Sequence, residues 1–510
     1  MSSNNRKIGA VLSYASIIVS TLVQLIYTPF LIKKLGQGEY GLYSLVNSII
    51  GYLTIFDLGF GNAIIVYTSK YRALGKVEEE KKMHGMFKII FWIIAIFVCV
   101  LGIILYFNVN NIFDASMTNQ ELNKTKIMML ILTFNLFITF VFNIYSAIIN
   151  AYEKFIFQKI TSILNTLLKP ILMIPLLFLG YKSITMVVVL TLVNLLVVIS
   201  NYLYCNYKIG VKVHYCGFDK SVFKSIFGYS FWLFLGTIVD KINWSVDQFI
   251  LGAISGTAAV AIYSVASQIN SLFVNLSTAI SGVMLPKITK MIAIGSSNDD
   301  INNEFIKVGR LQYYIIFLMV SGFCLVGKKF IVLWAGSEFV ESFYVTLCLI
   351  IPVSIPLIQN LGLSIMQAKN KYKFKSIISF ITAVFNVVLS IFLAKEYGPL
   401  GSAIGTAISL IICNVIIINL YYYFVIGLNI NAFWKNILKM SIYFTIPVII
   451  ILLFMQFVQL DGLLAILTYA IFYSLIYVII CIFFVFNKYE KELFKKIMLK
   501  LSFMRCKKNG

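Results

Sequence analysis

The segment YLTIFDLGFGNAIIVYTSKYRALGK, residues 52–76, places the carboxylate of Asp57 inside an apolar run that extends over residues 42–69. This run is long enough to cross a lipid bilayer, because a membrane-spanning helix needs roughly 20 apolar residues. A carboxylate at the centre of such a helix costs roughly 2.5–3.5 kcal/mol on insertion scales. The segment therefore predicts a membrane helix in which Asp57 has a specific role.

The composition of the whole chain also indicates a membrane protein. Of its 510 residues, 60% are hydrophobic and only 12% are charged, whereas soluble domains carry about 25% charged residues. Apolar runs bounded by charged or turn residues predict an all-α membrane protein with about fourteen transmembrane helices. We expect them at residues 8–32, 40–68, 86–107, 126–150, 156–180, 183–205, 225–252, 257–284, 309–335, 340–367, 374–394, 400–426, 433–457 and 462–487.

Two connectors of the predicted bundle resemble each other. KLGQGEYGLYSLVNSI (34–49) joins the first and second predicted helices, and ILGAISGTAAVAIYSVASQI (250–269) joins the seventh and eighth. Six helices separate these segments, so they share one orientation, as in the parallel repeats of several transporter folds. The duplication predicts an N-terminal six-helix lobe at residues 1–205 and a C-terminal six-helix lobe at residues 225–426. Two additional transmembrane helices at 433–487 and a basic amphipathic cytoplasmic tail at 488–510 then complete the chain.

Positive charge is distributed unevenly between the two sides of this bundle. Lysine and arginine concentrate in the N-terminus and in every second connector. Lys169 and Lys241 lie inside predicted spans and are assigned to neither side. The opposite side holds only Lys33, Lys34, Lys124, Lys126, Lys182, Lys328, Lys329 and Lys395. Because positive residues mark the cytoplasmic side, both termini are predicted to be cytoplasmic. The net charge of +22 therefore follows topology, and no basic, aromatic-rich surface suggests nucleic-acid binding.

Ionisable residues near the middle of predicted spans mark the candidate site. They are Asp57, Lys169, Asp240 and Lys241, with Asp247 nearer the outer end of its span. Such groups are best accommodated by a water-filled cavity. In the functional interpretation, the lysines bind an anionic group in transit, while the carboxylates pair with them, contact sugar hydroxyls or exchange protons. In the alternative interpretation, all of these residues form structural ion pairs that fix helix packing.

Metal and cofactor chemistry has no candidate motif in the sequence. The eight cysteines are scattered and form no CxxC pair, so we expect neither a disulfide nor a metal site. His84 and His214 fall in polar connectors, where we expect them to be solvated. We expect no cofactor, and coupling to a proton or sodium gradient stays open.

Three motifs resemble the polysaccharide flippases, which export O-antigen and capsule units. They are LGxxxYGLYxL (35–45), DLGFGNA (57–63) and VDQFILGAISGTAAVAIYSVASQI (246–269), and Pro286 also fits the pattern. These flippases belong to the multidrug/oligosaccharidyl-lipid/polysaccharide exporter superfamily. The resemblance covers essentially the whole chain.

The resemblance implies a MATE-like fold with two six-helix bundles around a central cavity, plus two extra helices. It also implies translocation of an undecaprenyl-pyrophosphate-linked oligosaccharide across the bacterial cytoplasmic (inner) membrane. Lys169 and Lys241 are then candidates for binding the pyrophosphate at mid-depth, and Asp57 for pairing with a lysine or carrying a coupling proton. Arg310 and Lys154, near cytoplasmic helix ends, are candidates for attracting the pyrophosphate, although a role as topology determinants fits each of them as well. Expected partners are this lipid-linked substrate, membrane lipids and other polysaccharide-assembly proteins.

Two other functions are considered. A glycan polymerase or ligase would need catalytic side chains in a large external loop, yet the longest predicted external connector, 108–125, is short and lacks His and Arg. A cation-coupled multidrug antiporter of the same superfamily would act without a glycan pathway. We therefore expect a transporter and not an enzyme.

Overall fold

The computed structural model describes residues 3–213, 217–281, 288, 290–292, 294–369, 371–458, 462–492 and 494–495. Backbone contacts divide the chain into two compact units. The first unit comprises Met1–Gln268 and Ser379–Ser409, and the second comprises Ile269–Ile378 and Leu410–Gly510. The regular structure of the described residues is helical throughout, which confirms the all-α class. This division differs from the two lobes expected at 1–205 and 225–426, which stay a prediction.

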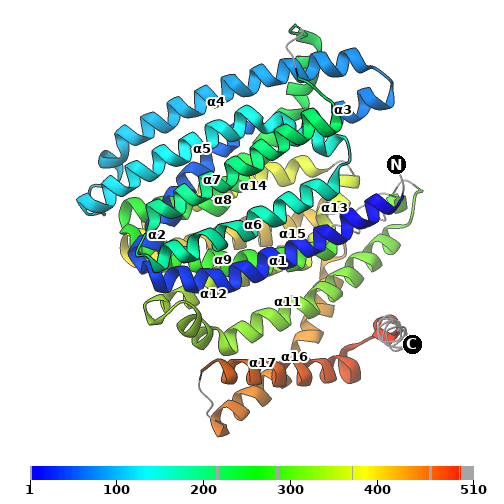
Figure 1. The fold of residues 1–510 in the computed structure, drawn as a ribbon. Helices are drawn as coiled ribbons and strands as arrows, with labels where there is room; N and C mark the ends of the chain where they lie inside the picture. Colours follow the sequence, from blue (N-terminus) through cyan, green and yellow to red (C-terminus); the bar gives the residue numbers. More distant parts are fainter. Residues whose placement is uncertain are drawn as a thin grey trace, which may run out of the picture. The chain divides into compact units, whose positions relative to one another are not determined.

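The first unit is built mainly from the N-terminal helices (Figure 1). They are α1 (Ser3–Leu35), α2 (Gln37–Leu53), η1 (Thr54–Asp57), α3 (Phe60–Ala73), α4 (Val77–Phe113), α5 (Asn119–Ala151), α6 (Phe155–Phe178), α7 (Ser183–Leu203), η2 (Tyr204–Ile209) and α8 (Lys220–Ile254). The unit also takes in the first part of α9 (Gly256–Ser281) and most of α14 (Tyr372–Ser409).

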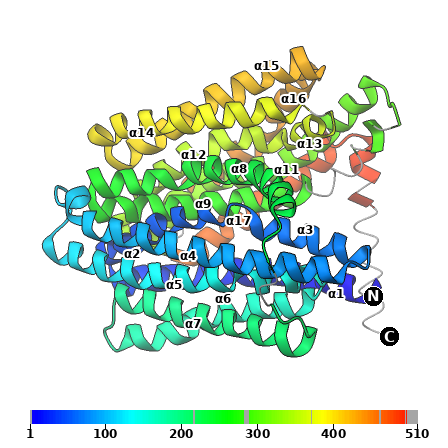
Figure 2. The ribbon, with the colours of Figure 1, turned by 90° about the horizontal axis from the view of Figure 1, so that it is seen from above.

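Close helix packing in the first unit follows from small residues at the contacts. Figure 2 shows α4 lying along α5, and the same pairing is evident in Figure 1. At this contact a Cβ atom added to Gly102 would lie 2.4 Å from the side chain of Thr133. Helices in membranes associate through such close contacts, because burial from water contributes little between them. Gly102 therefore fixes how near α4 and α5 can lie.

The second unit contains the remaining helices of the described chain. They are α11 (Asn298–Trp334), η3 (Ser337–Phe339), α12 (Glu341–Ile358), α13 (Asn360–Ala368), η4 (Leu410–Ile417), α15 (Ile418–Tyr421), η5 (Tyr422–Ile426), α16 (Ile430–Phe457), α17 (Gly462–Ile480) and η6 (Cys481–Val485). One core cluster includes Phe305 and Phe433, whose ring centroids lie 4.8 Å apart. A second cluster includes Phe444 and Tyr477 at the same centroid distance.

Twelve helical stretches of the described residues are long and apolar enough to cross a membrane. The expected count of about fourteen is not confirmed and stays a prediction. The difference arises at two places. The stretch Tyr372–Ile426 counts once, although Gly398 within it has a non-helical backbone (φ 55°, ψ −133°) and precedes Pro399. Helix α8 is 35 residues long, and among its described residues Ser245–Ile254 forms a shorter apolar helix.

His84 is not solvated as the sequence suggested. Its side chain is 1% exposed within α4, and Nε2 lies 2.8 Å from the hydroxyl of Thr68 on α3. The error arose because the charged stretch before residue 86 was taken for a connector, whereas α4 already begins at Val77. His214 and the tail beyond Lys495 lie outside the described residues.

Candidate functional site

Asp57 lies where the second predicted span breaks. The helical segment formed by α2 and η1 ends at Asp57. Leu58 and Gly59 then adopt left-handed backbone angles (φ 53° and 71°), and α3 begins at Phe60. The amide of Asn143 on α5 donates a hydrogen bond of 2.6 Å to Oδ1 of Asp57. The backbone N–H of Gly61, in the first turn of α3, donates to the same carboxylate. Asp57 thus satisfies one backbone donor at the N-terminus of α3, where negative charge is favoured.

Lys169 and Lys241 differ from Asp57 because the structure gives neither ammonium group a partner among the described residues. Lys169 is half-buried on α6, and Lys241 is half-buried on α8. Nζ of Lys241 points toward α2, where it lies 3.7 Å from the position of a Cβ atom added to Gly51. The side chain of Asp240 lies outside the described part of the chain. Two membrane-embedded cations in the first unit therefore remain without a described counter-ion.

Asp247 on α8 is the best-coordinated intramembrane carboxylate of the predicted set. It is 1% exposed. The phenol of Tyr263 on α9 donates to Oδ2 at 2.7 Å, and the hydroxyl of Ser402 on α14 donates to Oδ1 at 2.6 Å. The hydroxyl of Thr406 lies 3.1 Å from Oδ2. Three helices of the first unit thus converge on one carboxylate, without any lysine in the set.

The hydroxyl groups around Asp247 have further oxygen acceptors within hydrogen-bond distance. Thr406 Oγ1 lies within hydrogen-bond distance of Asp247 Oδ2, of Asn386 Oδ1 (3.0 Å) and of the Ser402 carbonyl (3.2 Å). Ser390 Oγ lies 2.9 Å from Asn386 Oδ1 and 3.2 Å from the same carbonyl. Each hydroxyl carries one proton and donates to one acceptor at a time. Carboxylate, amide, carbonyl and hydroxyl oxygens gathered in this way are the ligand types that a proton or a small cation prefers.

The two arms of α14 bring these oxygens together. The helix reverses at Gly398–Pro399, and a Cβ atom added to Gly405 would lie 2.8 Å from the backbone nitrogen of Ser390. Sequence reasoning identified Asp247 but not the hydroxyl groups that surround it. A usable signal was present, since Asn386 and Ser390, and likewise Ser402 and Thr406, are spaced four residues apart and share a helix face.

Arg310, on α11 of the second unit, is already paired within the protein. Its Nε donates to Glu490 Oε1 and its guanidinium NH₂ group donates to Oε2, both at 2.8 Å. The Tyr314 hydroxyl also donates to Oε2, at 3.0 Å. Glu490 lies beyond the last candidate span. Burial opposes its charged form, but its bonds and attraction to Arg310 outweigh burial, so the pKa of Glu490 lies below its usual range.

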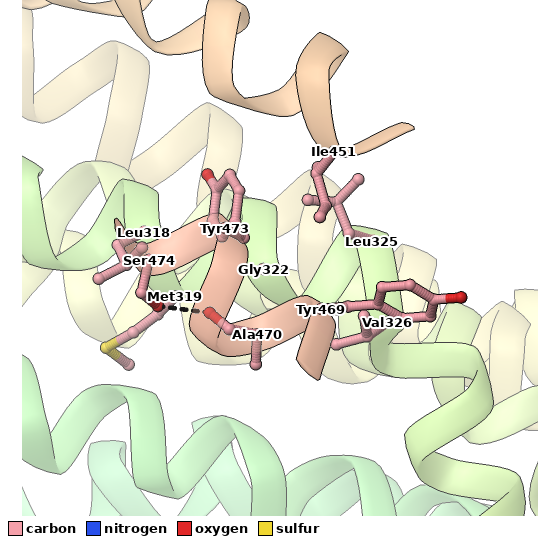
Figure 3. Close-up of a pocket in the computed structure, with 10 residues that line it drawn as sticks. All are labelled: Leu318, Met319, Gly322, Leu325, Val326, Ile451, Tyr469, Ala470, Tyr473 and Ser474. Atoms are coloured by element: carbon pink, nitrogen blue, oxygen red, sulfur yellow. Dashed lines mark hydrogen bonds between the residues drawn. The ribbon is translucent and has the colours of Figure 1, made fainter. Parts of the chain in front are cut away.

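A pocket of about 190 Å³ in the second unit is chemically different from these sites (Figure 3). It lies between α11, α16 and α17 and is lined mainly by apolar side chains such as Leu318, Leu325 and Ile451. The Ser474 hydroxyl donates a 2.7 Å hydrogen bond to the Ala470 carbonyl, as the dashed line in Figure 3 marks. Its proton is therefore not available to a ligand in the pocket. The pocket contains none of the predicted site residues and no charged group, so it does not suit a sugar or a pyrophosphate.

Comparison with known protein families identifies the family to which the chain belongs. Residues 8–292, more than half of the chain, match the family described as "Polysaccharide biosynthesis protein". The chain belongs to this family. It is a family of membrane transporters and not of enzymes. The resemblance inferred from the three motifs is therefore confirmed, and a polymerase or ligase activity is excluded.

Individual relatives agree with this family assignment. The chain is 23% identical over 406 residues to a Shigella flexneri protein named "Putative O-antigen transporter", covering 77% of this chain and 92% of that protein. Among solved structures, the lipid II flippase MurJ in an inward closed conformation aligns with a TM-score of 0.72 at 20% identity, covering 93% of this chain and 97% of MurJ. An inward-facing multidrug MATE transporter aligns with a TM-score of 0.64 at 13% identity, covering 82% and 95%. The chain thus has the MurJ/MATE-like fold and is a multi-pass membrane protein of the kind found in bacterial inner membranes.

Proposed function

We propose that this flippase moves an undecaprenyl-pyrophosphate-linked oligosaccharide from the inner to the outer leaflet of the cytoplasmic membrane by alternating access. The observation that carries the proposal is the pair of half-buried lysines, Lys169 and Lys241, without described counter-ions in a chain of this family. An unpaired ammonium group in a membrane is costly. A pyrophosphate that binds there offsets this cost, because its oxygens accept charge-assisted hydrogen bonds.

The substrate chemistry agrees with this arrangement. Sugar hydroxyls and a pyrophosphate cannot cross hydrocarbon without polar partners, while a polyprenyl tail can stay in the lipid. The name of the Shigella flexneri relative supports an O-antigen-type unit as cargo. We keep Asp240 in the proposed cavity beside Lys241, because it neighbours Lys241 in the seventh predicted span.

We assign the coupling step to Asp247. Its three hydroxyl partners and the additional oxygens of Asn386 and the Ser402 carbonyl form a site that a proton or sodium ion, as co-transported ion, can occupy. Binding of a cation there neutralises a buried charge, so it favours one packing of α8 against α14 over another. Asp57 and Arg310 are hydrogen-bonded within the protein, and we assign them structural roles.

Deletion of the gene in its bacterium tests the proposal. The strain should accumulate lipid-linked repeat units on the inner leaflet and lose surface polysaccharide, and the full-length chain should restore both. Unchanged surface polysaccharide, together with a loss of cation-dependent dye efflux, would favour the multidrug antiporter instead.

A further inference from the structure

The internal duplication extends beyond the two connectors, to helices that carry the candidate site residues. Phe157, at the start of α6, stacks on Tyr204 with ring centroids 3.8 Å apart. Phe374, near the start of α14, stacks on Tyr421 with ring centroids 3.9 Å apart. The two stacked pairs have the same separation in sequence. Equivalent positions on α6 and on the first arm of α14 can therefore be counted from the two phenylalanines.

The connectors relate a second pair of segments in the same way. Gly36, before α2, and Gly256, at the start of α9, both have a φ of 81°. Tyr43 and Tyr263 each follow seven residues later, so they occupy equivalent positions on α2 and α9. Helix α1 precedes the first glycine, and α8 precedes the second. Equivalent positions on α1 and α8 can therefore be counted back from the glycines.

These two relations match the residues of the Asp247 site to a second set of side chains. Asp247, Tyr263, Asn386 and Ser390 correspond in this order to Tyr27, Tyr43, Lys169 and Met173. A phenol thus stands where the first set has a carboxylate, an ammonium group where it has an amide, and a thioether where it has a hydroxyl. The carboxylate and amide acceptors are lost, and O–H and N–H donors take their positions. The second set therefore has the opposite polarity.

Tyr27, Tyr43 and Lys169 come from helices of the first unit that pack together. Helix α1 lies along α6 (Figure 1). Tyr27 and Tyr43 both pack against one apolar cluster, and this cluster includes Met173, one turn beyond Lys169 on α6. The two phenols are also near enough to interact electrostatically. We call Tyr27, Tyr43 and Lys169 the Lys169 triad.

The Lys169 triad is more accessible than the Asp247 site. Asp247, Tyr263 and Asn386 are each 3% exposed or less, whereas all three members of the triad are half-buried. Among the described residues, neither the Tyr27 hydroxyl nor the Lys169 ammonium group has a hydrogen-bond partner. A closed site suits a bare ion, because the protein supplies all of its ligands. A more open site with free donors suits an anionic group that belongs to a larger molecule.

We propose that the Lys169 triad is an oxyanion site, the duplicate of the Asp247 site with inverted charge. The Tyr27 and Tyr43 hydroxyls bind the pyrophosphate of the substrate together with Lys169. This inference rests on the proposed function, which supplies a pyrophosphate as the anion. Ammonium and phenol donors form charge-assisted hydrogen bonds with phosphate oxygens. A free phosphate or pyrophosphate ion has the same chemistry, so the experiments below separate the two sources.

Binding of inorganic pyrophosphate to the purified full-length protein, measured by isothermal titration calorimetry, tests the triad without the lipid-linked cargo. Tyr27→Phe and Tyr43→Phe should each weaken binding by roughly 10-fold, because each removes a donor to a charged acceptor. Tyr145→Phe is the matched control, since Tyr145 is a buried tyrosine of α5 whose ring contacts Tyr202 on α7. It should bind as the wild-type protein does. A wild-type protein that binds no pyrophosphate, or equal affinities in all four proteins, would overturn the proposal.

The equivalent residue of the cation site supplies a sharper variant at Lys169. Lys169→Asn should lose pyrophosphate binding, and Lys169→Arg should retain it, with the Tm of each variant as the measure of folding. Wild-type affinity in a folded Lys169→Asn protein would overturn the proposal.

Undecaprenyl pyrophosphate without sugars distinguishes the two sources of the anion. It should displace inorganic pyrophosphate from the wild-type protein, and failure to do so would overturn the assignment of the triad to the lipid-linked substrate. The expected dependence of pyrophosphate binding on Tyr27 and Tyr43, found for a protein that exports no lipid-linked oligosaccharide, would leave the oxyanion site standing and overturn only the proposed cargo.

Discussion

Tyr263 donates a 2.7 Å hydrogen bond to Oδ2 of Asp247, and both side chains are buried. Asp247 lies on α8 and Tyr263 on α9, and the remaining donors come from α14. A carboxylate deep in a membrane protein is usually paired with a cation. Here hydroxyl groups take that place among the described residues.

Asp247→Asn should therefore abolish transport without preventing membrane insertion. The amide has the shape of the carboxylate but neither its charge nor a site for a proton. Transport driven by an imposed proton or sodium gradient is the measurement, with protein amount in the membrane as the control. Wild-type rates for Asp247→Asn would show that the carboxylate plays no part in coupling.

Thr406→Val should weaken coupling, whereas Thr406→Ser should retain it. The hydroxyl lies 3.1 Å from Asp247 Oδ2 and 3.0 Å from Asn386 Oδ1, and a hydrogen bond to a charged group contributes about 1.5–3 kcal/mol. The cation concentration for half-maximal transport should thus rise by roughly 10- to 100-fold in Thr406→Val. Similar values for the valine and serine variants would show that the hydroxyl does not contact the cation.

Lys241→Ala and Lys169→Ala should each block transport of the lipid-linked unit, because each removes a cation proposed to meet the pyrophosphate. Lys159→Ala, on the same helix α6 as Lys169 but close to its N-terminal end, is the matched control and should stay active. Binding of the lipid-linked substrate to purified protein is measured together with transport. Normal binding and transport in both variants would remove the lysines from the site.

Asp57→Asn and Asp57→Ala separate a structural role from a charged one. Asparagine keeps an acceptor for the Asn143 amide, whose bond to Asp57 is 2.6 Å long. We expect Asp57→Asn to retain most transport and Asp57→Ala to lose about 1–3 kcal/mol of stability, because the Asn143 amide then has no acceptor. Thermal unfolding and export are the measurements. Loss of export in a stable Asp57→Asn protein would instead support the proton-carrying role first predicted from the sequence.

The Arg310–Glu490 pair predicts a pH dependence of stability. The pKa of Glu490 is lowered in the folded protein despite burial, chiefly because its carboxylate accepts bonds from Arg310. The pair therefore stabilises the protein fully above the ordinary carboxylate pKa, and this contribution is lost as the pH falls through the lowered value. Replacing one partner of such a buried pair costs about 3–5 kcal/mol. The Tm of Glu490→Gln should thus lie well below that of the wild-type protein at neutral pH, and the difference between the two Tm values should shrink in acid. A difference in Tm that is equal at every pH would contradict an ionic origin of the stabilisation.

The helix positions could be predicted from the sequence, because they depend on local patterns of residues. The apolar runs located the helices, and the division after residue 180 was right because Gly180 adopts a φ of 88° between α6 and α7. The duplicated connectors were also visible as a motif, although the close approach of Gly41 to the Thr257 carbonyl, 1.8 Å from an added Cβ atom, was not.

Long-range partners could not be predicted from the sequence. Ser402 lies 155 residues from Asp247, and Glu490 lies 180 residues from Arg310. Their bonds arise from helix packing, which a single sequence does not encode as a local pattern. The partners of Asp57 could not be predicted for a different reason. An isolated carboxylate in an apolar run gives the same sequence pattern whether it bonds a helix end or lines a cavity.

The most direct test of the account is reconstitution of the purified full-length chain in liposomes that carry an undecaprenyl-pyrophosphate-linked oligosaccharide in one leaflet. The measured quantity is the fraction of oligosaccharide that becomes accessible to a membrane-impermeant lectin on the other side. We predict that this fraction rises with time under an imposed cation gradient for the wild-type chain, and that Lys241→Ala and Asp247→Asn stay at the level of protein-free vesicles. Wild-type protein that transfers no more oligosaccharide than empty vesicles, yet expels a cationic dye from the same preparation, would contradict the account.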